Sequence, residues 1–86
     1  MDIIQLSQIV KKKILYHKII ESVEVEDKSF LHKKHKLNNL EKFHIKLKIK
    51  SNELKKKNQI ESNKFIYKIL DVEMKKHIHS LQILFI

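Results

Sequence analysis

The chain has 86 residues, of which 42% are hydrophobic and 34% charged, and it carries a formal net charge of +9. So short a chain builds at most one small domain. Because cysteine, glycine and proline are all absent, the sequence excludes disulfides, thiolate metal sites, iron–sulfur clusters, cysteine nucleophiles and glycine-rich phosphate loops. The basic charge, carried by lysine alone, favours polyanionic or acidic partners without choosing among them.

The first predicted element is a helix over residues 3–25. Apolar residues there recur at alternating spacings of three and four, which places them on one helix face. The register runs through Leu6, Ile9, Lys13, Tyr16, Ile20 and Val23, and five of these six residues are apolar. A polar cluster from Glu26 to Ser29 then marks a boundary in place of glycine or proline.

Two further helices are predicted, over residues 30–54 and 58–84. Ser29 has the position of an N-cap for the first, and Asn58 followed by Glu61 has the spacing of a capping box that opens the second. The middle register runs through Phe30, Lys33, Leu37, Leu40, His44, Leu47, Ser51 and Leu54. The last register runs through Ile60, Asn63, Tyr67, Leu70, Met74, His77, Leu81 and Leu84.

Two short segments also fit an extended conformation. Residues 44–50 alternate strictly between polar and apolar, and residues 22–26 alternate as well, which is the pattern of a half-buried strand. Paired as a hairpin, these segments would set glutamates opposite lysines. Because the helical registers continue through both segments and no usual turn dipeptide separates them, we prefer helices.

These elements predict a single all-α domain over residues 1–86, folded as an antiparallel three-helix bundle. The alternatives are a helical hairpin that forms a coiled-coil dimer, and an α+β fold with a small hairpin, so a monomer or a homodimer is expected. No apolar run approaches the roughly 20 residues needed to cross a bilayer. The apolar N-terminal residues precede their lysines, the reverse of a signal peptide, and a cytoplasmic location is expected.

The sequence predicts no catalytic, cofactor or metal site. His32 and His35 lie three residues apart and would share a helix face, but further ligands are missing. His77 and His79 lie two residues apart, a spacing that splays them on a helix. Because a slim bundle rarely encloses a pocket in which acid and base groups converge, the chain is predicted not to be an enzyme.

The segment from Ile9 to Lys18 resembles the opening helix of the tubulin-binding cofactor A family. That family continues with an acidic loop, an aromatic residue and a Lys-Lys-Gln sequence, and the corresponding residues here are Glu26-Asp27, Phe30 and Lys33-Lys34-His35. The resemblance implies a three-helix bundle that holds β-tubulin, an acidic partner, without nucleotide or metal. The partner-binding residues expected from this interpretation are Tyr16, Lys33, Lys34 and His35.

Two other classes of function stay open. Lysines at residues 11–13, 33, 34, 36 and 55–57 are compatible with a basic protein that binds nucleic acid without sequence specificity, since lysines gain affinity through counterion release. The other class is a structural subunit whose helices complete a larger assembly.

Overall fold

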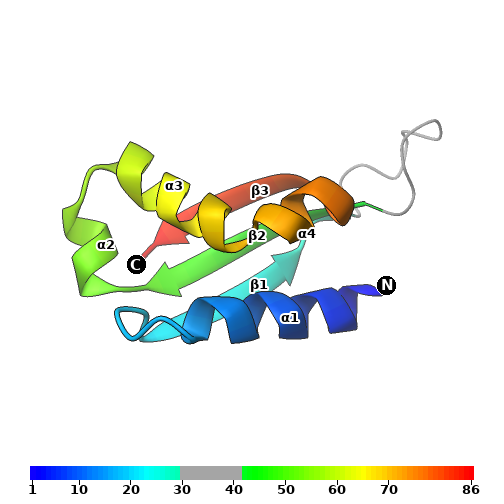
Figure 1. Cartoon of the computed structure of the whole chain (residues 1–86), viewed down its shortest axis with the longest axis horizontal. Helices are drawn as coiled ribbons and strands as arrows, with labels where there is room; N and C mark the ends of the chain where they lie inside the picture. Colours follow the sequence, from blue (N-terminus) through cyan, green and yellow to red (C-terminus); the bar gives the residue numbers. More distant parts are fainter. Residues whose placement is uncertain (30–41) are drawn as a thin grey trace.

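The computed structural model describes residues 1–29 and 42–86 (Figure 1). Its elements are, in chain order, α1 (Ile3–Leu15), β1 (Ser22–Asp27), β2 (Phe43–Lys50), α2 (Asn52–Lys56), α3 (Gln59–Ile69), α4 (Asp71–Lys76) and β3 (Ile78–Phe85). The fold is therefore α+β. The predicted all-α three-helix bundle is wrong, and so is the alternative of a helical coiled-coil hairpin.

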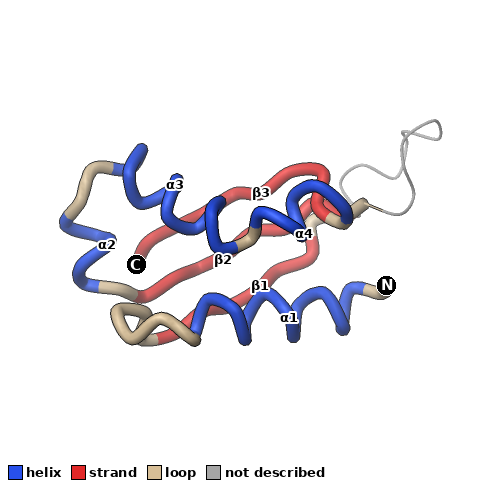
Figure 2. The backbone as a smooth tube through the Cα atoms, viewed as in Figure 1, coloured by secondary structure: helices blue, strands red, loops and turns tan. Residues whose placement is uncertain are grey.

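The three strands form one mixed sheet in the order β1-β2-β3. β1 pairs antiparallel with β2, whereas β2 pairs parallel with β3. A parallel pair needs a long crossover connection, and here α2, α3 and α4 supply it (Figure 2). The predicted helices over residues 30–54 and 58–84 are wrong at their C-terminal parts, because residues 43–50 and 78–85 are strands.

β1 and β2 are the two segments that alternate in the sequence, and they pair with glutamate opposite lysine, as in Glu24 opposite Lys48. Glu26 accepts from Lys48 Nζ at 3.1 Å and from Lys28 Nζ at 3.2 Å. Lys48 first and Lys28 second hold the pKa of the Glu26 carboxyl below its ordinary value of 4.5. The same contact with Glu26 raises the pKa of Lys48 above 10.5. These charges lie on the polar face of the sheet.

The helices cover the other face of the sheet, where the apolar strand residues point. In β2 the side chains of Ile45, Leu47 and Ile49 are buried while the residues between them are half-buried. α1 packs against β1 and α4 against β3, and α3 contacts α1, α2 and α4 (Figure 1). The buried core that results consists of Leu6, Val10, Ile14, Ile20, Ile45, Leu47, Ile49, Leu54, Ile66, Leu70 and Ile78.

α1 is shorter than the predicted helix over residues 3–25. It begins at a capping box, in which the Gln5 amide donates to Asp2 Oδ1 at 2.8 Å and the Asp2 amide donates to Gln5 Oε1 at 3.2 Å. It ends at Leu15, and the chain then turns through a hydrogen bond from the Ile20 amide to the His17 carbonyl at 3.0 Å. No glycine or proline marks this turn, which is why the sequence did not reveal it.

The cap predicted at Asn58 is confirmed, because Asn58 Oδ1 accepts from the Glu61 amide at 2.9 Å at the start of α3. The Ser29 hydroxyl accepts from the His44 amide at 3.1 Å, and residues 30–41, where the helix that Ser29 was expected to open would begin, lie outside the described residues. Within residues 1–29 and 42–86, no helix has the length and apolar character needed to cross a membrane.

Candidate functional site

Three segments of the chain meet at one end of the sheet. β1 ends there, and β2 and β3, being parallel to each other and antiparallel to β1, both begin there. His77 lies between α4 and β3 at this end, the start of β3 brings His79 to it, and the start of β2 brings His44. We call His44, His79 and Ser80 together the histidine end.

A β-bulge shapes the histidine end. Phe43 pairs with Ile78 and His44 pairs with Ser80, so His79 is an extra residue in β3. Ile78 is buried, whereas His79 and Ser80 are both exposed before alternation resumes at Leu81. Bulges commonly redirect a side chain next to a functional site. Here the bulge presents two successive polar side chains to the same neighbour, His44.

The His44 ring contacts both of these side chains. Its centroid lies 4.9 Å from that of His79, in a T-shaped arrangement, and its Nδ1 lies 2.6 Å from Ser80 Oγ. The hydroxyl therefore fixes the orientation of the His44 ring. A ligand ring oriented in this way by a neighbouring polar group is typical of metal-binding histidines.

Main-chain hydrogen bonds hold the same residues in place. The Lys28 amide donates to the His44 carbonyl at 2.7 Å, and the Phe43 amide donates to the His77 carbonyl at 2.8 Å. The His44 amide is itself bound by the Ser29 hydroxyl. The imidazole pair is thus anchored to all three strands or their ends, and we expect it to be preorganised.

The site contains two adjacent imidazoles and no complete metal centre of its own. Among the residues that the structure describes, no group of three or more histidine, cysteine, aspartate or glutamate side chains is arranged to hold a metal ion. Lysines flank the histidine end on each contributing segment, at Lys28, Lys42, Lys46 and Lys76. Lys28 is paired with Glu26, and the remaining ammonium groups favour a metal centre with anionic ligands over a bare cation.

The sequence-predicted site residues lie elsewhere. Tyr16 follows α1 and its side chain is 83% exposed. Lys33, Lys34 and His35 lie outside the described residues, as does His32. The assignment of Tyr16, Lys33, Lys34 and His35 to partner binding therefore stays a prediction.

Tyr16 borders an open groove between α1 and α3. The His17 ring packs between Tyr16, at a centroid distance of 5.6 Å, and Phe65, at 5.3 Å. The groove has a volume of about 460 Å³ and is lined by Ile9, Lys12, Lys13, Tyr16, His17 and Ile69. Its described lining combines apolar side chains with two lysines, a tyrosine and a histidine.

Sequence reasoning missed the pairing of His44 with His79. It treated His77 and His79 as splayed residues of a helix, whereas α4 ends at Lys76 and His79 lies in the bulge of β3. A signal was present in the alternation of Leu81, Ile83 and Phe85, which predicts a strand after His79.

Comparison with known proteins agrees with this fold. A family model described as BolA-like protein matches residues 17–85. The BolA domain of SufE1 from Arabidopsis thaliana superposes with a TM-score of 0.75 at 26% sequence identity, covering 99% of this chain and 92% of that chain. BolA1 from Arabidopsis thaliana superposes with a TM-score of 0.71 at 22% identity, covering 88% of this chain and 83% of that chain. No curated protein sequence matches.

The fold and site define a small α+β domain with a helix-covered mixed sheet and a bulged, histidine-bearing third strand. This chain belongs to the BolA-like protein family. The resemblance to tubulin-binding cofactor A is therefore wrong, because its lysine-rich match falls on an amphipathic helix, α1, that packs on a sheet. The expectation that β-tubulin is the acidic partner depended on this resemblance and is wrong as well.

The two alternative functions are not supported either. The family match gives no support for a nucleic-acid-associated protein or for a structural subunit whose helices complete a larger assembly. Of the lysine clusters, residues 11–13 lie on α1 and residues 55–57 lie at α2. One member, Lys13, is bound to Glu73.

Proposed function

We propose that this BolA-like protein is a non-enzymatic binding protein whose histidine end supplies imidazole ligands, His79 foremost, to a metal centre carried by a partner protein. The observation that carries the proposal is the bulge, which sets the exposed His79 against the ordered His44 ring at 4.9 Å. Imidazole nitrogen is a preferred ligand of zinc, copper, iron and nickel.

The incomplete ligand set supports a shared centre. Zinc and related ions in proteins usually take four ligands, and two imidazoles leave half of that set to be filled by another molecule. The flanking lysines favour anionic ligands, so we propose that the partner contributes thiolates. One structural neighbour is a BolA domain of another protein, SufE1, which supports the idea that this fold works beside a second protein module.

The absence of catalytic function is part of the proposal. Two grooves in the described residues are lined by apolar side chains, lysines, one histidine, one tyrosine and one glutamine. The buried carboxylate of Glu73 is bound by Lys13 and is thereby neutralised. We also propose a cytoplasmic location, which the order of residues in the sequence favours and cell fractionation would test.

A zinc titration tests the ligand role directly. We expect Zn²⁺ to shift the imidazole NMR resonances of His44 and His79 together. His79→Ala should weaken this binding by about tenfold or more, the scale typical of a damaged metal site. His77→Ala is the matched control, because His77 is half-buried at the end of α4 and outside the ring pair. Equal losses in both variants would contradict the proposal.

N-acetylcysteine then serves as a probe for the thiolates of the partner. If the histidine end shares a centre, adding the thiol should raise the zinc-bound fraction of His79 by forming a mixed complex. Removal of zinc from His79 by the thiol would contradict a shared centre, even if zinc alone binds.

A further inference from the structure

The outer edge of β3 is a sheet edge that no strand among the described residues covers. In the described part of the chain β3 pairs with β2 alone. The Ile86 amide donates to the Ile49 carbonyl at 2.9 Å. Because main-chain groups point to alternate sides along a strand, the N–H and C=O groups of Phe85 and Ile83 point away from β2.

Among residues 1–29 and 42–86, hydrogen-bond partners for this edge are found in its first half only. The Tyr67 hydroxyl on α3 donates to the Leu81 carbonyl at 3.2 Å. Ile83 and Phe85, in the second half, have no corresponding contact with any described residue. The second half of β3 therefore presents the unpaired main-chain N–H and C=O groups of two residues.

The two edges of the sheet differ in how they are protected. β1 carries three carboxylates, on Glu24, Glu26 and Asp27, and charges of this kind oppose pairing with another strand. β3 reads IHSLQILF and carries no lysine, aspartate or glutamate, although a third of the whole chain is charged. β3 is thus the edge that is chemically suited to accept a strand.

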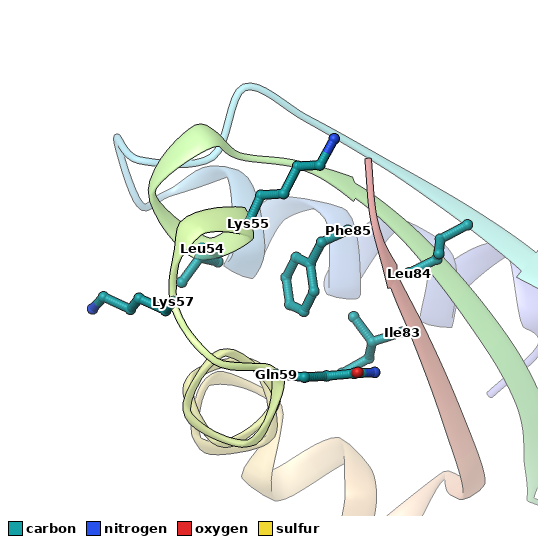
Figure 3. Close-up of a pocket in the computed structure, with 7 residues that line it drawn as sticks. All are labelled: Leu54, Lys55, Lys57, Gln59, Ile83, Leu84 and Phe85. Carbon is teal, nitrogen blue, oxygen red and sulfur yellow. The ribbon is translucent and has the colours of Figure 1, made fainter.

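A cavity opens beside the exposed half of this edge (Figure 3). It has a volume of about 200 Å³ and is lined by Leu54, Lys55, Lys57, Gln59, Ile83, Leu84 and Phe85. Figure 3 shows the Phe85 ring between Leu54 and Ile83. This volume is below the ~300 Å³ at which pockets for small-molecule ligands begin, so it suits one apolar side chain better than a cofactor.

The wall of the cavity opposite β3 is held by buried hydrogen bonds. The Ser62 hydroxyl donates to the Leu54 carbonyl at 2.6 Å, and both residues are buried. The Ser51 hydroxyl accepts from the Leu54 amide at 3.3 Å and donates to the Ile19 carbonyl at 2.7 Å. The cavity is therefore a fixed feature beside an unpaired edge.

The charged side chains that line the cavity are both lysines, Lys55 and Lys57. The Lys57 side chain points outward from the rim in Figure 3. An occupant that carries carboxylates on either side of an apolar residue would match this arrangement.

We propose that the outer edge of β3 binds an extended peptide segment of a partner protein as a fourth strand. Main-chain groups of the peptide pair with Ile83 and Phe85, a large apolar side chain enters the cavity, and flanking carboxylates meet Lys55 and Lys57. This is strand addition to an exposed sheet edge, in which main-chain hydrogen bonds give affinity and a side-chain pocket gives specificity.

A second copy of the chain suits this edge less well. Pairing β3 with β3 would bring Lys55 and Lys57 of both copies to one interface, and each copy carries a net charge of +9. The peptide site also lies at the end of β3 opposite His79, so it does not depend on the metal-binding proposal.

The probe is a short fluorescein-labelled peptide of alternating glutamate and valine around a central phenylalanine. Binding is measured by fluorescence anisotropy, and the contact is located by amide hydrogen exchange. We expect slower exchange at Ile83 and Phe85 when the peptide is added. A peptide with N-methylated alternate amides, or with lysine in place of glutamate, should bind at least about tenfold more weakly.

Two charge-reversed proteins locate the electrostatic contact. Lys55→Glu with Lys57→Glu should weaken peptide binding by about tenfold or more. Lys11→Glu with Lys12→Glu changes the net charge equally, on the exposed side of α1, and should alter binding by less than about twofold. Circular dichroism confirms that both proteins are folded.

Several outcomes would overturn the strand-addition proposal. They are equal weakening by the two double reversals, unchanged exchange at Ile83 and Phe85, or sedimentation that shows the chain pairing with itself along β3. His79→Ala should keep full peptide binding, so loss of the zinc site and loss of the peptide site are distinguishable.

Discussion

Lys13 on α1 and Glu73 on α4 form a close ion pair across 60 residues of sequence. Lys13 Nζ lies 2.9 Å from Glu73 Oε1 and 2.7 Å from Oε2. Glu73 is 5% exposed, so its carboxylate depends on this ammonium for charge compensation. The contact fastens α1, which precedes the part matched by the family model, to the helices that cross over to β3.

We predict that Lys13→Met lowers the free energy of unfolding by about 2 kcal/mol, because it leaves a buried carboxylate without its charged hydrogen-bond partner. Denaturation by urea measures the loss. Lys12→Met, at an exposed neighbouring position, should change stability by less than about 0.5 kcal/mol. Combining Lys13→Met with Glu73→Leu should recover most of the loss, since replacing both partners removes the stranded charge. A double variant that is less stable than Lys13→Met would contradict this account.

We predict that Ser62→Ala destabilises the protein by about 1–3 kcal/mol, because it leaves the buried Leu54 carbonyl without the donor that lies 2.6 Å away. Ser22→Ala, at an exposed position on β1, is the control and should cost less than about 0.5 kcal/mol. Equilibrium unfolding of the two variants and of the wild type measures these changes in free energy. Similar values for both would show that the buried hydroxyl contributes no net stability.

The Glu26 ion pairs predict how stability depends on pH. The pKa of Glu26 is lowered in the folded protein, so its stabilising contribution is present above its ordinary value of 4.5 and is lost as the pH falls through the lowered folded pKa. The pKa of Lys48 is raised, so its contribution is present below 10.5 and is lost only when the pH rises through the raised folded pKa.

Wild type should therefore melt at a higher temperature than Glu26→Gln at neutral pH and low salt. The difference in melting temperature should vanish in strong acid, and about 1 M salt should shrink it. Glu21→Gln, on an exposed residue before β1, is the control for removal of one carboxylate. A difference between wild type and Glu26→Gln that persists in acid would rule out the ion pairs as its source.

The sequence contained enough to predict β2. Leu47 fits both a heptad and a strand alternation, but Ile45 and Ile49 are apolar and lie off the helical register. A strand explains all three residues, and all three are buried. The helical interpretation was wrong because it left the apolar side chains of Ile45 and Ile49 outside the predicted buried face of the helix.

The parallel pairing of β3 was harder to predict. Leu81 and Leu84 extend a helical register, whereas in the structure Leu81, Ile83 and Phe85 share the covered face and Leu84 lies on the other. Which strand pairs with β3, and in which direction, depends on the crossover through α2, α3 and α4 rather than on local pattern. The cap at Asn58, by contrast, depends on neighbouring residues alone and was predicted correctly.

The contact between His44 and His79 depends on both the parallel register and the bulge, so neither residue could be assigned from its neighbours in sequence. Two single-residue deletions, each of which removes the bulge, test whether the His79 imidazole is a zinc ligand. Deleting His79 leaves Ile78 inward, Ser80 opposite His44 and Leu81 inward, which is the alternation of a regular strand. Deleting Ser80 gives the same regular strand with His79 opposite His44.

Because both deletions restore the alternation, we expect the two variants to differ in unfolding free energy by less than about 1 kcal/mol. They should differ sharply in zinc binding. The variant that lacks Ser80 keeps two imidazoles on directly opposed residues, which in paired strands lie about 5 Å apart, and should bind Zn²⁺. The variant that lacks His79 keeps one imidazole and should bind about tenfold more weakly or worse. Equal zinc affinity in the two variants would show that His79 is not a ligand and that the bulge serves the packing of Ile78 instead.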